Sequence, residues 1–292
     1  MGAPDGASGD AALVITAYGE RSMDVLGRLS IPERLAALAG LAATIASLAG
    51  FVPGLYRDPR VVVAQSHGYD AGNLFAVIVL GLALRASARG SLRGRLLAIG
   101  ALGCLVYSYV TYAFVIVLNP ATLLYIAVLA FGGWSFAAGL ASVDERQTES
   151  TVGLHVPRRT TAIFLLLVAV VFAFNWLGQI VGSVTSGQLP PELRAAGWPM
   201  NPVYVLDLGF VLPLMGLASV RLLARRPAGV RLAVPLLVFQ PLLALSILAM
   251  AVSGAADGSG TRTSGPRDLR RRRARQHHAG LVRAGSSSPE RH

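Results

Sequence analysis

The chain has 292 residues, and its 14% of charged residues lies well below the roughly 25% of a typical soluble domain. This deficit excludes a protein whose whole surface faces water, and a mean hydropathy of +0.56 favours a chain that lies largely within a membrane. The net charge is +11, and all basic residues other than histidine are arginines. The single cysteine, Cys104, excludes an intrachain disulfide and a cysteine-based metal site.

Residues 1–30 are acidic and glycine-rich, and they lack the basic stretch and short apolar core of a cleavable signal peptide. Seven apolar runs follow, each about long enough to cross the roughly 30 Å of hydrocarbon in a bilayer. They cover residues 34–52, 71–89, 96–118, 121–143, 160–182, 203–220 and 232–252. The sequence therefore predicts an all-α fold, a polytopic bundle of about seven transmembrane helices within residues 31–252.

Three short motifs predict where spans begin. In "SIPE", Ser30 is the expected N-cap of the first span and Glu33 its capping-box partner. The dipeptide "NP" occurs at 119–120 and at 201–202, where asparagine caps a free backbone N–H and proline sets the first helical φ. We therefore expect Asn119 to cap the fourth span and Asn201 to cap the sixth.

Arginines flank the predicted spans unevenly. Fourteen lie in the N-terminal flank and in the loops 85–95, 144–159 and 221–231, whereas the opposite side carries three. Because cytoplasmic loops are rich in basic residues, this asymmetry places the N-terminus in the cytoplasm. It predicts a multi-pass protein of the bacterial cytoplasmic membrane.

The last segment, residues 253–292, conflicts with this orientation. Seven spans place it outside the cell, yet it includes "RRRRAR" at 270–275. The last apolar run does not span, or an eighth span has been lost, or the segment is an out-of-frame extension; we favour the last two together. A basic tail that binds anionic lipid is the functional alternative, and nucleic acid is a less favoured partner.

Polar residues concentrate in the outer halves of the predicted spans. The third span carries three tyrosines, the fifth a pair of amides four residues apart, and the sixth a tyrosine and an aspartate three residues apart. These residues are Tyr107, Tyr109, Tyr112, Asn175, Gln179, Tyr204 and Asp207. The predicted outer loop 53–70 adds further polar side chains on the same side, and the inner halves carry almost nothing comparable.

A carboxylate within a span is costly unless it is paired or hydrated. We therefore expect Asp207 to accept hydrogen bonds from one or more span tyrosines, or to pair with Arg57. Three interpretations stay open: a structural polar cluster, a pocket for a ligand or ion, and a catalytic centre. Stripes of small residues, such as Ala42, Ala46 and Gly50, favour close packing of helices within the chain over dimerisation.

Catalysis has little support in the sequence. It contains no HExxH, GxSxG or Walker motif, and no pair of carboxylates falls within the predicted spans. His67 with Asp58 or Asp70 is the one candidate acid/base pair, and its spacing is unspecific. We expect no catalytic residue, no metal site and no cofactor.

Three stretches, "PGLYRDPRVVVAQ", "YSYVTYAFVIVLNPATLLYIAV" and "NPVYVLDLGFVLPLMGL", resemble a group of uncharacterised polytopic bacterial membrane proteins that is common in GC-rich genomes. The resemblance covers roughly residues 30–250 and implies no activity. It implies a further span after the seventh, from which this chain departs. The recurrent positions that it implies are Tyr56, Tyr107, Tyr109, Tyr112, Asn119, Tyr204 and Asp207.

These observations predict an integral membrane protein that binds or transports a small molecule or ion through an outward-facing pocket. The alternatives are an enzyme of the outer leaflet, with Asp207, Asp70 or His67 as its acid or base, and a non-catalytic subunit or scaffold. The expected partners are the lipid bilayer, a small-molecule or ion ligand, and a second copy of the chain or a larger membrane complex.

Overall fold

The computed structural model describes residues 27–257, and that part of the chain is mostly helical, with no strands. Seven helical segments are long and apolar enough to cross a membrane, which confirms the predicted all-α membrane bundle. They are α2 (Ile31–Gly50), α3 (Arg60–Ser87), α4 (Leu92–Val115), α5 (Thr122–Ser142), α7 (Arg158–Ser186), the segment Pro202–Leu223, and α11 (Pro227–Ala256). The protein is a multi-pass integral membrane protein.

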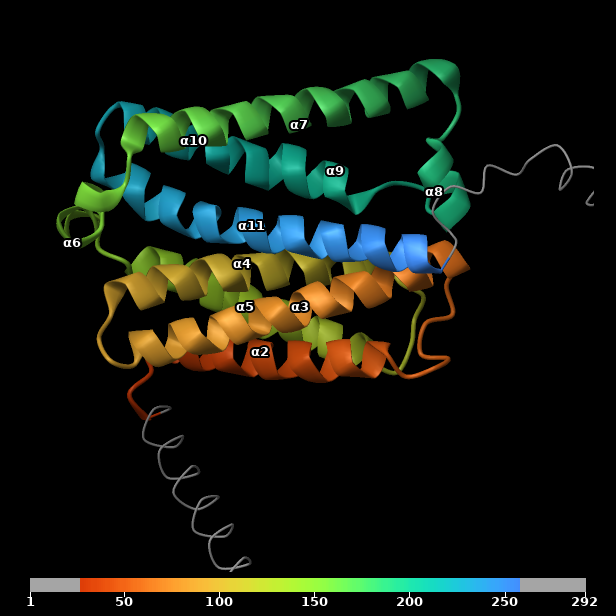
Figure 1. Cartoon of the computed structure of the whole chain (residues 1–292), viewed down its shortest axis with the longest axis horizontal. Coiled ribbons are helices and arrows are strands. Elements are labelled where there is room, and N and C mark those ends of the chain that lie inside the picture. The colour runs from red at the N-terminus through yellow and green to blue at the C-terminus, as the bar shows by residue number, and fades with distance from the viewer. Residues whose placement is uncertain (1–26, 258–292) are drawn as a thin grey trace, which may run out of the picture.

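The spans form two groups that share α11 (Figure 1). In the first group, α2, α3, α4 and α5 pack as a four-helix ring in which each helix runs antiparallel to the next. Helix α11 packs along α3 and α4 on one side and against α10 (Leu212–Leu223) on the other, and α10 packs against α7. Three short helices join these elements: α6 (Glu145–Thr151), η1 (Gly153–His155) and α8 (Pro191–Ala196).

Glycines let α11 approach the ring closely. A Cβ atom at Gly72 would lie 2.7 Å from the Cα atom of Ser246, and one at Gly100 would lie 2.5 Å from the carbonyl oxygen of Pro235. Because these neighbours are backbone atoms, no side-chain rotation relieves the overlap. The α3–α11 and α4–α11 contacts therefore depend on glycine at both positions.

The buried apolar side chains form two clusters. The tyrosine core lies mainly among α2, α3, α4, α5 and the later part of α11, and it buries six tyrosines. The aliphatic core lies mainly among the beginning of α4, α7, α10 and the beginning of α11, and its buried members are aliphatic side chains and Met215. Large apolar side chains such as Phe174 and Leu123 are exposed on the outside, as helices in lipid require.

Two of the three predicted helix starts are confirmed. Ser30 and Glu33 form the capping box of α2, and the side chain of Asn201 accepts a hydrogen bond of 3.0 Å from the N–H of Val203. Asn119 is different, because α5 begins three residues later with Ala121 as its N-cap. The Asn119 side chain instead closes the turn before the helix by accepting a bond of 2.9 Å from the N–H of Ala121.

The sixth span is broken into α9 (Pro202–Leu206), the π-helical turn η2 (Asp207–Val211) and α10. Pro213 explains the wide turn, because it has no N–H to give to the carbonyl of Gly209 and its ring crowds that carbonyl. A π-helical turn changes the direction in which its side chains project. Asp207 is the first residue of this turn.

The second span is longer than predicted. Helix α3 begins at Arg60 rather than at residue 71, so Gln65, His67 and Asp70 lie in the helix and not in an outer loop. The polar side chains of residues 60–70 are typical of a loop, but most residues of this stretch are packed against neighbouring helices. At the other end of the chain, α11 continues to Ala256, and residues 258–292 of the predicted tail 253–292 fall outside the described residues.

Candidate functional site

Asp70 is the centre of a buried polar cluster in the tyrosine core. Its side chain is 1% exposed and lies among α2, α3 and α4. The hydroxyl of Tyr56 donates to Oδ2 at 2.6 Å, and the hydroxyl of Tyr112 donates to Oδ1 at 3.0 Å. Tyr112 also lies 3.0 Å from the carbonyl oxygen of Ser66. Both carboxylate oxygens are therefore held by neutral hydroxyl groups.

Helix α2 completes this cluster through a serine and a glycine. Tyr109 donates to the carbonyl of Ala43 at 3.0 Å, so its one proton is used and the Ser47 hydroxyl, also at 3.0 Å, donates to Tyr109. A Cβ atom at Gly50 would overlap the Asp70 carboxylate and would lie 2.7 Å from the Tyr56 hydroxyl oxygen. The carboxylate thus occupies space that only glycine leaves free.

Tyrosine rings pack around the cluster. The ring of Tyr112 lies 5.4 Å from that of Tyr109, 5.8 Å from that of Tyr69 and 5.3 Å from that of Tyr125, measured between centroids. Such ring pairs stabilise beyond the area that they bury. The rings exclude lipid from the carboxylate, and the hydroxyls of Tyr109 and Tyr112 still reach polar partners.

A second contact between α3 and α4 lies one turn from Asp70. The Ser108 hydroxyl donates to Oδ1 of Asn73 at 2.7 Å, and both side chains are fully buried. Nδ2 of Asn73 has no hydrogen-bond partner among the described residues. A buried amide with free donors is costly, so this nitrogen is a place where an oxygen acceptor is favoured.

The loop 51–59 closes the cluster at the end of the bundle. Burial raises the pKa of the Tyr56 hydroxyl well above its usual range, and the Asp70 charge raises it further, so Tyr56 remains a neutral donor. Asp58 fastens the same loop by accepting a bond of 3.1 Å from the N–H of Val117. Burial raises the pKa of Asp58 above its ordinary value.

A second polar centre surrounds Asp207, between the two helical groups. Its Oδ1 accepts a bond of 3.0 Å from the Tyr107 hydroxyl on α4, and its Oδ2 accepts one of 2.7 Å from the indole N–H of Trp176 on α7. Close by, Tyr204 donates to Gln179 at 2.8 Å, and its ring packs against Trp176. Asp207 is 7% exposed and forms no ion pair with any of the described residues. It too is therefore a buried carboxylate that neutral donors hold.

The predicted site residues therefore divide between two centres. The expected hydrogen bond from a span tyrosine to Asp207 is confirmed for Tyr107, whereas Arg57 is exposed and makes no ion pair with Asp207. Asn175 lies exposed on α7, and no side-chain hydrogen bond within residues 27–257 joins it to either centre. The sequence analysis placed no two carboxylates within spans, which is wrong because Asp70 and Asp207 both lie in transmembrane helices.

His67 forms no acid/base pair with Asp58 or Asp70 in this arrangement. Its ring stacks on Phe51 at 5.7 Å and lies 6.0 Å from the ring of Tyr56. Asp58 is bonded to a backbone N–H and Asp70 to tyrosines, so neither is the expected acid/base partner of His67.

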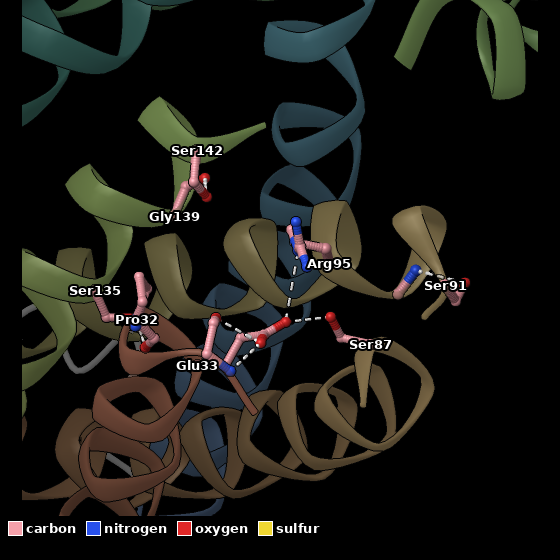
Figure 2. A network of polar contacts seen from close by, with 10 residues as sticks. Pro32, Glu33, Ser87, Ser91, Arg95, Ser135, Gly139 and Ser142 are labelled. Carbon is pink, nitrogen blue, oxygen red and sulfur yellow. Dashed lines mark hydrogen bonds and ion pairs between the residues drawn. The ribbon is translucent and has the colours of Figure 1, made fainter. Parts of the chain in front are cut away.

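A third polar centre, which the sequence analysis did not single out, lies at the opposite end of the ring (Figure 2). Glu33 accepts from the Ser30 N–H at 2.8 Å and from the Ser30 and Ser87 hydroxyls, and Arg95 lies 3.6 Å away. The capping-box motif explained Glu33 by a local role, and nothing in the sequence showed that α3 and α4 also reach it. The spans thus carry a polar centre at the end opposite Asp70, where the sequence analysis expected almost none.

Within the part of the chain that the structure describes, no group of three histidine, cysteine, aspartate or glutamate side chains could hold a metal ion. Comparison of the chain with models of protein families, with curated proteins and with solved structures finds no match in any of the three. The function therefore has to be argued from the buried carboxylates.

Proposed function

We propose that this protein binds or transports a small cation, and that Asp70 is its cation-binding group. The observation that carries the proposal is the Asp70 side chain, which is 1% exposed in a membrane span and bonded by tyrosine hydroxyls on both oxygens. The ion pairs among residues 27–257 join arginines to Glu33, Glu149 and Glu145, and none involves Asp70.

The charge of Asp70 supports this proposal. An ionised carboxylate in a bilayer costs several kcal/mol, and neutral hydroxyl groups offset only part of that cost. A proton or a small metal cation removes the remaining charge, so its arrival is favoured by the same burial that opposes the bare carboxylate. Structural salt bridges avoid this dependence with a permanent basic partner, and Asp70 has none among the described residues.

Asp207 fits the same class of chemistry, because its partners are also neutral donors. Asp207 is the first residue of a π-helical turn, and such turns occur often at functional sites. We assign the protein to the bacterial cytoplasmic membrane with its N-terminus in the cytoplasm, on the asymmetry of the arginines in its loops. Asp70 and Asp207 then lie nearer the outer face.

Proton flux into liposomes tests the proposal. The purified full-length chain is reconstituted, a potassium diffusion potential is applied, and a trapped pH dye reports proton entry with and without external sodium. We expect flux of protons, or flux that sodium alters, and a decrease of the flux in Asp70→Asn of about tenfold or more, because the neutral amide cannot bind a cation by charge.

The matched control is Asp58→Asn, which neutralises a carboxylate in the loop next to the cluster and keeps an acceptor for the Val117 N–H. This variant should retain the parental flux. If folded Asp70→Asn protein moves cations at the parental rate, the cluster is structural and the proposal fails. Turnover of a lipid substrate without flux would support the enzyme of the outer leaflet instead.

A further inference from the structure

Beside Glu33 lies a cavity of about 20 Å³ at the end of the ring that carries α6. All four helices of the ring contribute to its wall: Glu33 and Ala36 from α2, Leu84 from α3, Arg95 and Leu102 from α4, and Ser135, Gly139 and Ser142 from α5. A volume of this size holds one water molecule or an ion of similar size. Figure 2 shows the Ser135 and Ser142 side of the wall facing Glu33 and Arg95.

The wall carries the groups that a small cation needs. Glu33 supplies a carboxylate that is 8% exposed, and the lining serines offer hydroxyl oxygens. Oxygen ligands are those that hard cations and protonated water prefer. Arg95 is the one other charged residue in the wall, because α3 and α5 contribute apolar groups and hydroxyls there.

The Glu33–Arg95 pair is loose. Its separation of 3.6 Å exceeds the roughly 2.7–2.9 Å of a charge-assisted hydrogen bond, and the Arg95 side chain is 38% exposed. Arg95 can therefore turn into water when another cation neutralises Glu33. The bonds from Ser30 and Ser87 hold the carboxylate in place meanwhile.

We propose that this cavity is a second binding site for a water-sized cation, with Glu33 as its carboxylate ligand and Arg95 as the counter-charge that leaves when the cation binds. The inference rests on the proposed function, in which Asp70 binds the same cation near the other end of the same four-helix ring. Apolar side chains, among them Ala39, Leu80 and Leu105, are buried between the two sites. A cation that crosses the membrane would then meet one carboxylate near each end of the bundle, with apolar side chains between them.

Thiol labelling tests the site without a need for transport. Ser142 is exposed and lines the cavity, so we place a single cysteine there in a Cys104→Ser background of the full-length chain in nanodiscs. Labelling rates are compared in sodium and in choline chloride, and before and after an acid step. Sodium at about ten times its dissociation constant should slow labelling by about tenfold.

Glu33→Gln should abolish this protection, because the neutral amide keeps the length of the side chain but loses its charge. Arg95→Gln should shift protection to lower sodium or weaker acid, because no counter-charge has to leave. Glu149→Gln is the matched control, since it removes a carboxylate that is paired with Arg158 outside the cavity wall. It should respond like the parent.

Sodium protection identifies a metal cation, and protection by acid that only Glu33→Gln removes identifies a proton. Equal responses in the parent and in Glu33→Gln, or no response to either cation, would overturn the second site. Flux that depends on Asp70 without any response at Ser142→Cys would leave the proposed function standing and remove only this inference. Protection without flux would keep the cavity as a cation site and remove the transport function.

Discussion

The tyrosine core and the aliphatic core are packed in different ways within one membrane bundle. Six buried tyrosines fill the first, and hydroxyls among them meet Asp70, Asp207, Ser47 and backbone carbonyls. The second buries leucine, valine, alanine, isoleucine and methionine, which fit by shape. In a bilayer, shape alone gives adequate packing, so the polar groups of the first core point to a role other than stability.

This difference indicates that the tyrosine core serves to hold buried carboxyl groups. Tyrosine combines a large ring with one hydroxyl group, so a ring of tyrosines can be as densely packed as leucine and still hold a carboxylate. A buried polar network also fixes one arrangement of its helices, because a slip breaks the hydrogen bonds of its buried groups. The aliphatic core has no such penalty and tolerates small shifts.

The largest expected loss of stability comes from a void in the aliphatic core. Leu165→Ala removes a fully buried side chain from α7 and leaves a void in the aliphatic core where α7 packs against α10, so we expect a loss of about 2–5 kcal/mol. Unfolding in mixed detergent micelles measures it. Leu167→Ala, on the exposed face of the same helix, should cost much less, and equal losses would show that α7 packs differently.

The next largest loss of stability is expected from a steric overlap in the tyrosine core. Gly50→Ala places a methyl group against the Asp70 carboxylate and the Tyr56 hydroxyl, so the network has to shift at a cost of about 1–3 kcal/mol. Gly81→Ala, on the next helix, meets no neighbour within 4 Å and should be neutral or slightly stabilising. Unfolding of the two variants side by side gives the comparison, and similar stabilities would contradict the close approach at Gly50.

A double-mutant cycle tests which tyrosine is bonded to which of the two aspartates. Tyr107 and Asp207 share a hydrogen bond, so the losses in Tyr107→Phe and Asp207→Asn should couple by about 1–2 kcal/mol. Tyr112 donates to Asp70 instead, so the losses in Tyr112→Phe and Asp207→Asn should add to within about 0.5 kcal/mol. The reverse result would assign the tyrosines to the wrong aspartates.

The smallest effect comes from Asp58, at the edge of the tyrosine core. Its pKa is raised in the folded protein, so folding takes up protons and stability falls as pH rises from the ordinary pKa of an aspartate to the raised one. Asp58→Asn should therefore be more stable than the parent at neutral pH, by less than about 1 kcal/mol because the side chain is half-buried. The two proteins should converge in acid, and a parallel pair of stability profiles would refute the shift.

The sequence predicts the membrane bundle well, because apolar runs of about 20 residues are rare outside membrane spans. It also predicts that a span tyrosine meets Asp207, since a buried carboxylate needs donors at the same depth. It fails at α3, where Arg60, His67 and Asp70 resemble a loop. The hydrogen-bond partners of Asp70 come from α4 and from the loop 51–59, and no local pattern reveals contacts that distant.

The same limit applies to the partners of Asp70 and Glu33. The sequence predicts a loop position for Asp70 and a local helix cap for Glu33, and each role is chemically sufficient on its own. Only the packing of the four-helix ring brings Tyr112 to Asp70 and Arg95 to Glu33. Gly50 belongs to a stripe of small residues in the sequence, but which neighbour it admits depends on the order of the helices.

The position of α11 has a consequence for how the chain is made. Spans enter a membrane in the order of synthesis, and α11 follows the other six. The ring of α2–α5 can close as soon as α5 is inserted, whereas α10 gains its packing against α11, which itself packs on α3 and α4, only when the last span arrives. The buried carboxylates thus reach their hydrogen-bond partners at different moments: Asp70 when α4 meets α3, and Asp207 only after α7 and the sixth span have joined α4.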